Sequence, residues 1–369
     1  MMKEGKFGTM EAVALTTIVL ITKAFYTSIR VLVKATSTSA WFATLISCSV
    51  SILLFLLVYL LMKRFPNKEL VEIFEIVTGK FIGKILALIF SAYFVYYAGS
   101  SLREFVEMIK AYVLPYTPPS AIIFVFLAVV VFFAYVGLEG IARMSYISLI
   151  IVIIGLTLIL ILPLPFYNVD NLFPLAGYSL QTTLFSGLLR ASAYSDVIFL
   201  AFIINAIHGV KQFKKVGLTS LALSGAIISV TILCSILAFE YTQASENLSA
   251  LFQLSRNIYF NRFFQRVESI FIFIWVVASI INVSLVFYMA TSIFCKAFKI
   301  PNHRPSLLPL AFCTFTVTLL PESLSEVVEK NVLFLRQYSI FITYLIPLLV
   351  LLLALIRGKK GEKIKVEKV

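Results

Sequence analysis

The chain has 369 residues, of which 60% are hydrophobic and 13% are charged, and its mean hydropathy is +0.99. Soluble domains are usually about 45–50% apolar and about 25% charged. This composition therefore excludes a soluble enzyme, a disulfide scaffold and a disordered protein. It indicates an integral membrane protein.

Apolar runs long enough to cross a bilayer recur along the whole chain. An α-helix needs about 20 apolar residues to span the hydrocarbon. Ten candidate spans follow in chain order, at residues 10–30, 41–61, 85–108, 122–137, 145–162, 183–205, 218–241, 267–294, 307–320 and 337–356. The sequence therefore predicts an all-α membrane protein with about ten transmembrane helices, which form a single transmembrane domain over residues 1–369.

The basic residues of the predicted loops indicate the orientation. Of the 31 lysines and arginines, 20 fall on the side of the termini and 8, Arg336 among them, on the opposite side; the remaining 3 are Lys23, Arg103 and Arg190, within spans. Because cytoplasmic loops carry the excess of basic residues, we expect both termini and the basic tail at 357–369 in the cytoplasm. The formal charge of +13 is then an orientation signal with some attraction to the lipid bilayer, and we expect no nucleic-acid partner.

The longest predicted loop on the outer side covers residues 242–266. It mixes polar residues with apolar ones, namely Phe252, Ile258, Tyr259, Phe260 and Phe263. Two interpretations stay open: a helix that lies on the membrane surface or against a partner, or a plain solvated loop. The short basic tail at 357–369 is expected to be disordered.

Two ionisable side chains lie near the middle of predicted spans, Lys23 in the first and Asp196 in the sixth. A charge at this depth costs several kcal/mol unless it is paired or faces a wet cavity. At 1.5 Å per residue, Lys23 lies roughly 4–5 Å to the outer side of its span midpoint and Asp196 about 3 Å to the inner side. We therefore predict a Lys23–Asp196 ion pair that acts as a proton- or ion-responsive latch. The alternatives are that both charges face water separately, or that the pair is purely structural.

Other ionisable residues lie closer to the predicted span ends. Arg103, Glu104 and Glu107 fall near the outer end of span three, and Arg190 lies about one turn into span six. Snorkelling of the long side chains to the interface explains both arginines, and an i,i+4 pair between Arg103 and Glu107 is a further possibility. These residues are therefore weaker functional candidates.

Lys23 and Asp196 hold corresponding places if the chain consists of two five-helix halves, at 10–162 and 183–356. An odd number of spans per half makes the second half enter from the opposite face, which gives the inverted repeat of secondary transporters. The first helix of each half is often interrupted at the midplane in such folds. The polar stretch 190–196 fits an interruption, whereas span one has no glycine or proline to open its helix.

Several short motifs follow one another along the chain. They are Leu114-Pro115-Tyr116-Thr117-Pro118 after span three, Gly140-Ile141-Ala142-Arg143 before span five, Asn171-Leu172-Phe173-Pro174-Leu175 before span six, and Arg266, Glu268, Phe271 and Trp275 at the start of span eight. In this order, and with about ten spans, the chain resembles the spore germination permeases, which are the B-type subunits of nutrient germinant receptors. That family is similar to the amino acid–polyamine–organocation transporters.

The resemblance implies a LeuT-like five-plus-five inverted repeat, with a ligand pocket between broken first and sixth helices and with helices three and eight at its sides. The ligand-binding residues that it implies are Thr22, Lys23, Tyr97, Ser192, Tyr194, Ser195, Asp196 and Asn282, with Ser284 as an alternative to Asn282. Family members often have glutamate at the position of Asp196 and small residues at Thr22 and Lys23. A lysine in the pocket changes which ligand fits, so the amino-acid germinants typical of the family do not follow automatically.

Two functions are compatible with this pattern. In the first, the chain is a sensor that binds a small nutrient in mid-membrane and changes conformation, together with an A-type subunit and a C-type lipoprotein in the inner membrane of dormant endospores. In the second, it is a proton-coupled permease for amino acids or amines. A membrane-embedded enzyme finds no support in the sequence, which has two histidines, no HExxH motif and no phosphate-binding glycine loop, and we expect no cofactor or metal.

Overall fold

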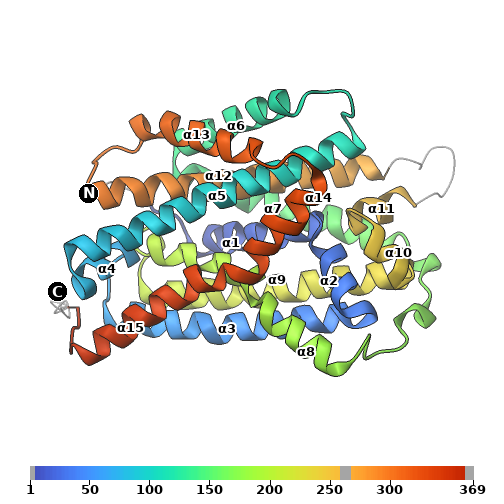
Figure 1. Ribbon diagram of the computed structural model, residues 1–369, viewed down its shortest axis with the longest axis horizontal. Coiled ribbons are helices and arrows are strands. Elements are labelled where there is room, and N and C mark those ends of the chain that lie inside the picture. The colour runs from blue at the N-terminus through green and yellow to red at the C-terminus, as the bar shows by residue number, and fades with distance from the viewer. Residues whose placement is uncertain (1–4, 258–266, 362–369) are drawn as a thin grey trace.

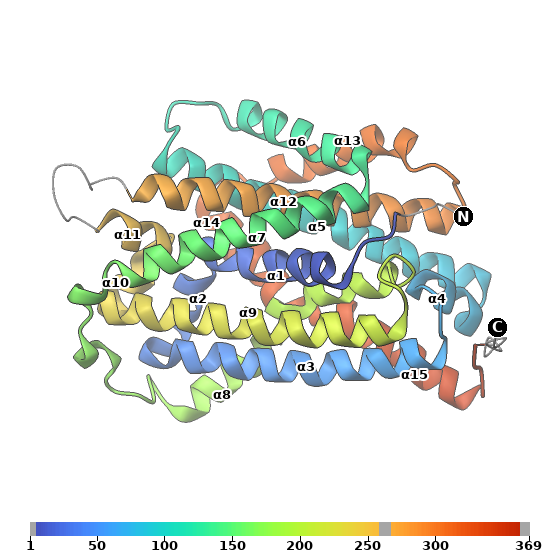
Figure 2. The same cartoon turned by 180° about the vertical axis from the view of Figure 1, so that it is seen from behind.

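The computed structural model describes residues 5–257 and 267–361, and within these ranges the chain forms helices and no strands. Long helices pack side by side in a bundle, with α1 (Thr9–Phe25) at its centre (Figure 1). The same helix lies behind α7 and above α9 when the bundle is seen from the other side (Figure 2). Because α1 is buried along nearly its whole length, its side chains meet the other helices rather than lipid.

The remaining elements follow the predicted spans in order. Those of the first half are α2 (Ser28–Thr36), α3 (Ala40–Arg64), α4 (Leu70–Thr78), α5 (Lys80–Tyr112), α6 (Pro119–Val136) and α7 (Leu138–Ile161). Those of the second half are α8 (Leu180–Leu189), the 3-10 helix η4 (Arg190–Phe202), α9 (Val210–Ala238), α10 (Tyr241–Glu246), α11 (Ala250–Arg256), α12 (Glu268–Phe298) and α13 (Arg304–Leu319). The last span consists of α14 (Leu324–Glu326), three π-helical stretches, η5 (Val327–Val332), η6 (Phe334–Tyr338) and η7 (Phe341–Leu345), and α15 (Ile346–Ile356).

Eight helical segments of the described chain are long and apolar enough to cross a membrane. Two further helices of the bundle, α1 and α13, have 17 and 16 residues and are somewhat shorter than the length that a straight span needs. The all-α membrane class is therefore confirmed. The count of ten spans stays a prediction.

Helices at matching places in the two halves pack against each other: α3 with α9, α5 with α12, and α6 with α13. The contacts of the first helix of each half also correspond. Helix α1 packs on α7 of its own half and on α9 of the other half, and η4 likewise packs on η6 of its own half and on α3 of the other. A twofold axis in the membrane plane produces this exchange, because it swaps the first half for the second. The packing therefore agrees with a five-plus-five inverted repeat.

The first span is broken although it contains no glycine or proline. Helix α1 ends at Phe25 and α2 begins at Ser28. Glu104 of α5 accepts hydrogen bonds from Thr27 N (3.1 Å) and from Thr27 Oγ1 (2.5 Å). A backbone N–H that donates to a side chain does not need the helical hydrogen bond to the carbonyl one turn earlier. The break therefore comes from a carboxylate on another helix, which a search for helix-breaking residues inside the span does not find.

The sixth span changes its helix type where the polar stretch begins. The α-helix α8 ends at Leu189, and the next 13 residues form the 3-10 helix η4. Stretches of 3-10 helix longer than about four residues are uncommon, and within a longer helix they often mark a hinge. The predicted interruption at 190–196 is therefore present, as a change of helix type rather than an unwound loop.

The last span begins earlier than predicted and is π-helical through its middle. It starts at Leu324 rather than at residue 337. Ser192 of η4 accepts a hydrogen bond from Ile340 N (3.1 Å) and donates one to Gln337 O (3.0 Å). Arg336, which the charge pattern placed in an outer loop, is consequently buried in the bundle, and that expectation is wrong.

The predicted outer loop contains the two short helices α10 and α11. Phe252 of α11 is buried, its ring stacks on Tyr112 with centroids 3.9 Å apart, and it meets Phe271 at 5.6 Å. Helix α11 thus packs on this chain's own helices, and neither a membrane-surface helix nor a solvated loop describes it. The other apolar residues named for this loop, and Arg266, lie outside the described residues.

The start of the basic tail is bound to the bundle. Arg357 Nη1 donates to Val77 O (2.9 Å), and Lys359 Nζ donates to Ile76 O (2.5 Å). Both carbonyls lie at the C-terminal end of α4, where cations are favoured by the helix dipole. The expectation of disorder is wrong for this part of the tail, and residues 362–369 lie outside the described ranges.

Candidate functional site

A polar cavity lies in the centre of the bundle, between the break of the first span and the 3-10 helix of the sixth. Side chains of α1, α5, η4, α12 and the last span line it. They are Lys23, Tyr26, Tyr93, Tyr97, Ser100, Ser101, Glu104, Asp196, Asn282, Val332, Leu335 and Arg336. The cavity thus joins spans one, three, six, eight and ten.

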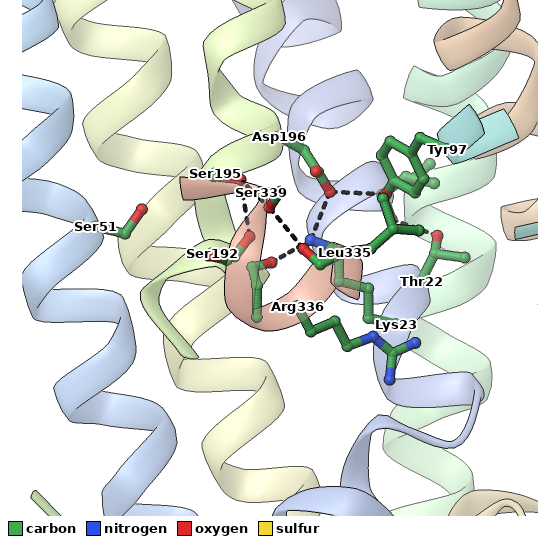
Figure 3. Close-up of polar contacts among 12 residues, drawn as sticks. Thr22, Lys23, Ser51, Tyr97, Ser192, Ser195, Asp196, Leu335, Arg336 and Ser339 are labelled. Atoms are coloured by element: carbon green, nitrogen blue, oxygen red, sulfur yellow. Dashed lines mark hydrogen bonds and ion pairs between the residues drawn. The ribbon is translucent and has the colours of Figure 1, made fainter. Parts of the chain in front are cut away.

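The predicted ion pair between Lys23 and Asp196 is present. Lys23 Nζ lies 2.5 Å from Asp196 Oδ2 and also donates to the carbonyl of Ala193. Tyr97 OH donates to the same carboxylate oxygen at 2.7 Å, and Figure 3 shows both contacts. Because both charges are more than nine-tenths buried, each depends on the other for its counter-charge.

The cavity is small in this conformation. About 20 Å³ is open to the centre of a water-sized molecule. That space holds about one water molecule, and the smallest amino acid is several times larger. A nutrient therefore needs the surrounding helices to move before it can enter.

A second ion pair, which the sequence did not predict, borders the cavity on the side away from the chain ends. Arg336 Nη2 lies 3.1 Å and 3.3 Å from the two carboxylate oxygens of Glu104. The same carboxylate holds Thr27 at the break of the first span. Glu104 thus ties together α5, the helix break and the last span. Its position inside an apolar span was a usable signal, but Arg336 was assigned to a loop.

The two arginines that were expected to snorkel are buried. Arg103 pairs with Glu107 at 2.8 Å, so the i,i+4 alternative is confirmed. Arg190 is 4% exposed, at the junction of α8 and η4. Snorkelling is therefore wrong for both side chains, because each is buried among the helices instead of extending to the surface of the bundle.

The other predicted ligand-binding residues divide into three groups. Asn282 lines the cavity, is 2% exposed, and has no hydrogen-bond partner for Oδ1 among the described residues. Ser192 and Ser195 face the last span, where Ser195 Oγ lies 3.3 Å from Ser339 Oγ. Tyr194 turns to α3 and shares a 2.9 Å hydrogen bond with Thr44.

Thr22, the remaining predicted residue, lies on the α12 side of α1. Its Oγ1 donates to Ile18 O at 2.5 Å and lies 3.5 Å from Ala278 O. The structure therefore brings Lys23, Tyr97, Asp196 and Asn282 to one cavity, and it places Thr22, Ser192, Tyr194 and Ser195 around it. The role of all eight in ligand binding stays a prediction.

A further pair, between buried Glu69 and partly buried Lys296, lies at the end of the bundle where α1 begins and α15 ends. Lys296 Nζ of α12 lies 2.8 Å from Glu69 Oε2 and donates to Phe202 O at 3.0 Å. Glu69 is the N-cap of α4, and Phe202 is the last residue of η4. The pair therefore links the segment between the second and third spans to the end of the sixth.

We predict that Glu69→Gln loosens this end of the bundle. A neutral amide removes the carboxylate charge that Lys296 contacts, and a charge-assisted hydrogen bond contributes roughly 1.5–3 kcal/mol. The adjacent thiol of Cys295, buried in the wild type, should then react with maleimide about tenfold faster or more, as followed by mass spectrometry of its peptide. Lys68→Gln removes only a half-exposed pair with Glu72 and is the control. An unchanged rate in Glu69→Gln contradicts the proposed closure.

Sequence comparison places this geometry in a family. Residues 6–327 match the profile of the spore germination protein family. The chain belongs to this family. Spore germination protein B2 of Bacillus subtilis (strain 168) is 25% identical over 367 residues, which cover 97% of this chain and 98% of that protein. Spore germination protein KB of the same strain is 22% identical over 334 residues, covering 89% and 90%.

Solved structures with the same fold are sodium- and cation-coupled transporters. A Na⁺-coupled sialic acid symporter in a substrate-bound outward-open state matches with a TM-score of 0.66 at 11% identity, over 91% of this chain and 79% of the symporter. A nucleobase-cation-symport-1 family transporter in a closed conformation with bromovinylhydantoin bound matches with a TM-score of 0.61 at 10% identity, over 87% and 73%. These matches show that the spore germination protein has the LeuT-like fold. Its fold is thus one that coupled transporters also have.

Proposed function

We propose that this spore germination protein is the nutrient-sensing B-type subunit of a germinant receptor. It binds a small germinant, an amino acid or a similar molecule, in the central cavity and signals by a change of conformation. The observation that carries the proposal is the closed, charged cavity between the break of the first span and η4. Relatives over nearly the whole chain are spore germination proteins, which supports this role over that of a general permease.

The side chains of the cavity suit a zwitterion. Asp196 and the free amide oxygen of Asn282 accept hydrogen bonds, as a ligand ammonium group requires. Lys23 and Arg336 donate, as a ligand carboxylate requires. Three tyrosines among the lining residues offer aromatic faces to a cation.

Binding and conformational change are coupled in this arrangement. The cavity holds about one water molecule, so a nutrient must part the side chains that close it. A ligand whose charges replace the Lys23–Asp196 and Arg336–Glu104 contacts binds the open state better than the closed one. Such differential affinity is what shifts a conformational equilibrium.

The proposed setting is the inner membrane of the dormant endospore, with both termini in the cytoplasm. The excess of basic residues on the terminal side supports this orientation. The nutrient, an A-type subunit and a C-type lipoprotein are the proposed partners. We propose further that the two five-helix halves are 10–162 and 183–356, with a basic cytoplasmic tail at 357–369.

The second candidate is a proton-coupled permease for amino acids or amines. The likeness of the fold to coupled symporters favours it, as does a buried lysine–aspartate pair that can exchange protons. Uptake of labelled amino acids by vesicles that contain this chain alone distinguishes the two. Uptake above that of empty vesicles supports the permease, whereas nutrient-dependent germination without uptake supports the sensor.

We predict that Asn282→Ala weakens the nutrient response without destabilising the protein. The amide oxygen has no hydrogen-bond partner to lose among residues 5–257 and 267–361, but a ligand hydrogen bond to it disappears. In Bacillus subtilis spores that carry this receptor as their only one, the nutrient concentration for half-maximal germination should rise about tenfold, the equivalent of roughly 1.4 kcal/mol.

A neighbouring residue supplies the matched control. Ser284 lies on the same helix and is fully buried, and its Oγ has no hydrogen-bond partner among the described residues, but it does not line the cavity. Ser284→Ala should therefore leave the response unchanged. Equal effects of the two variants, or no effect of Asn282→Ala, would place the nutrient site elsewhere.

A further inference from the structure

Arg190 is a buried cation that has no counter-charge in the part of the chain that the structure describes. Seven charged side chains of the described residues are buried, and six of them belong to ion pairs. Lys23 pairs with Asp196 and Arg336 with Glu104, so that both partners are buried. Glu69 and Arg103 pair with the partly buried Lys296 and Glu107. Arg190, at 4% exposure, is the seventh, and its Nη1 has no hydrogen-bond partner in the described chain. An isolated buried charge costs several kcal/mol, which a nearby opposite charge offsets.

A second cavity adjoins this guanidinium. It shares Lys23 with the central cavity, and its walls come from α1, α2, α3, η4 and α9. The polar lining residues are Lys23, Ser28, Thr44, Ser47, Arg190 and Tyr194. About 20 Å³ is open to the centre of a water-sized molecule, so the cavity takes one small body. No acidic side chain is among its lining residues.

The hydroxyl groups of this cavity leave a donor available. Tyr194 OH and Thr44 Oγ1 lie 2.9 Å apart and share one hydrogen bond, which uses one of their two hydrogens. The other hydroxyl hydrogen is left for an occupant, and Arg190 Nη1 is a donor without an acceptor among the described residues. Lys23, the other cation among the lining residues, is already paired with Asp196, so Arg190 supplies the positive charge of this cavity. The site thus presents donors and positive charge to one small occupant.

We propose that this cavity binds a halide-sized anion, chloride under physiological conditions, against Arg190 and the Thr44–Tyr194 hydroxyl pair. The anion neutralises the one unpaired buried charge of the described core and holds the junction of α8 and η4, from which the sixth span enters the central cavity. It is a second site, distinct from the proposed nutrient site. Its test needs no nutrient, so it succeeds or fails independently of the proposed function.

The test is binding of ³⁶Cl⁻ to the purified full-length protein in detergent, with sodium gluconate keeping the ionic strength constant. We expect one saturable site, and a thermal midpoint that rises with chloride or bromide but not with gluconate. Arg190→Gln should weaken chloride binding about tenfold or more, the equivalent of at least roughly 1.4 kcal/mol. Arg103→Gln, which alters a buried arginine that already has a carboxylate partner, should leave it unchanged.

A second variant keeps the test decisive if Arg190→Gln does not fold. Thr44→Asp places a resident carboxylate in the cavity, so the protein should become stable in gluconate and lose its chloride dependence. Three results would overturn the proposal: no halide dependence in the wild type, chloride binding by Thr44→Asp equal to that of the wild type, or a larger stabilisation by formate than by chloride. The last result would assign the cavity to a carboxylate group instead.

Discussion

Replacing Asp196 with asparagine should lower the free energy of unfolding by about 3–5 kcal/mol, because removal of one partner leaves the other charge buried and unpaired. Asparagine still accepts the hydrogen bond from Tyr97, but it provides no counter-charge for Lys23. Denaturant unfolding of the purified protein measures the loss. The nutrient response of spores should disappear as well, since the proposed site loses its anionic group.

The double variant separates the pair from its surroundings. Lys23→Met alone leaves Asp196 unpaired and should also be destabilising, whereas Lys23→Met with Asp196→Asn removes both charges. We expect the double variant to be more stable than either single one, because a buried pair can be replaced by neutral residues at little cost. Losses that simply add would show that the two charges do not depend on each other. A full nutrient response in both single variants would remove the latch from the mechanism.

Glu104→Gln should have an effect of similar size. This carboxylate is the partner of Arg336 and accepts two hydrogen bonds from Thr27 at the helix break. The variant leaves a buried guanidinium unpaired, for which we again expect a loss of about 3–5 kcal/mol. It should also loosen the cavity on this side. A cysteine introduced at Ser101, which lines the cavity and is 7% exposed, should therefore react faster with maleimide in Glu104→Gln than in the otherwise unchanged protein.

Glu326→Gln is the matched control for this prediction. Glu326 belongs to the last span, as Arg336 does, but it pairs with Lys330 on the exposed helix surface. Exposed i,i+4 ion pairs contribute little to stability, because water screens their charges. If Glu326→Gln and Glu104→Gln lowered stability equally, burial of the Glu104–Arg336 pair would not be what gives it its strength.

The sequence was a good guide to features that depend on local composition. The runs of apolar residues predicted the places of α3, α5, α7, α9 and α12 within a few residues at most ends, because the bilayer demands a length of apolar chain that can be counted. Lys23 and Asp196 could be identified because a charge within an apolar span is costly unless it is paired or faces a wet cavity. Their mutual contact followed from depth alone, and it is confirmed.

The sequence-based predictions failed where the hydrogen-bond or ion-pair partner of a residue comes from a distant segment of the chain. The break at 26–27 depends on the carboxylate of Glu104, and no residue inside the first span predicts it. Arg336 was placed in a loop because a basic residue next to an apolar run normally marks the interface, but Glu104 holds it inside. Ser192 and Tyr194 share the polar stretch with Asp196, yet the 3-10 geometry of η4 points them at the last span and at α3.

By itself, the amino-acid sequence determined that this chain enters a membrane as a set of apolar helices, and it singled out two charges, Lys23 and Asp196, that the structure then shows in contact. The tertiary structure alone decided which carboxylate opens the first helix, which arginine closes the cavity and which one stays without a partner. The physical reason is that transfer of a segment into lipid depends on its own residues and can be read along the chain. The partner of a buried charge is instead chosen by the packing of helices that lie far apart in sequence.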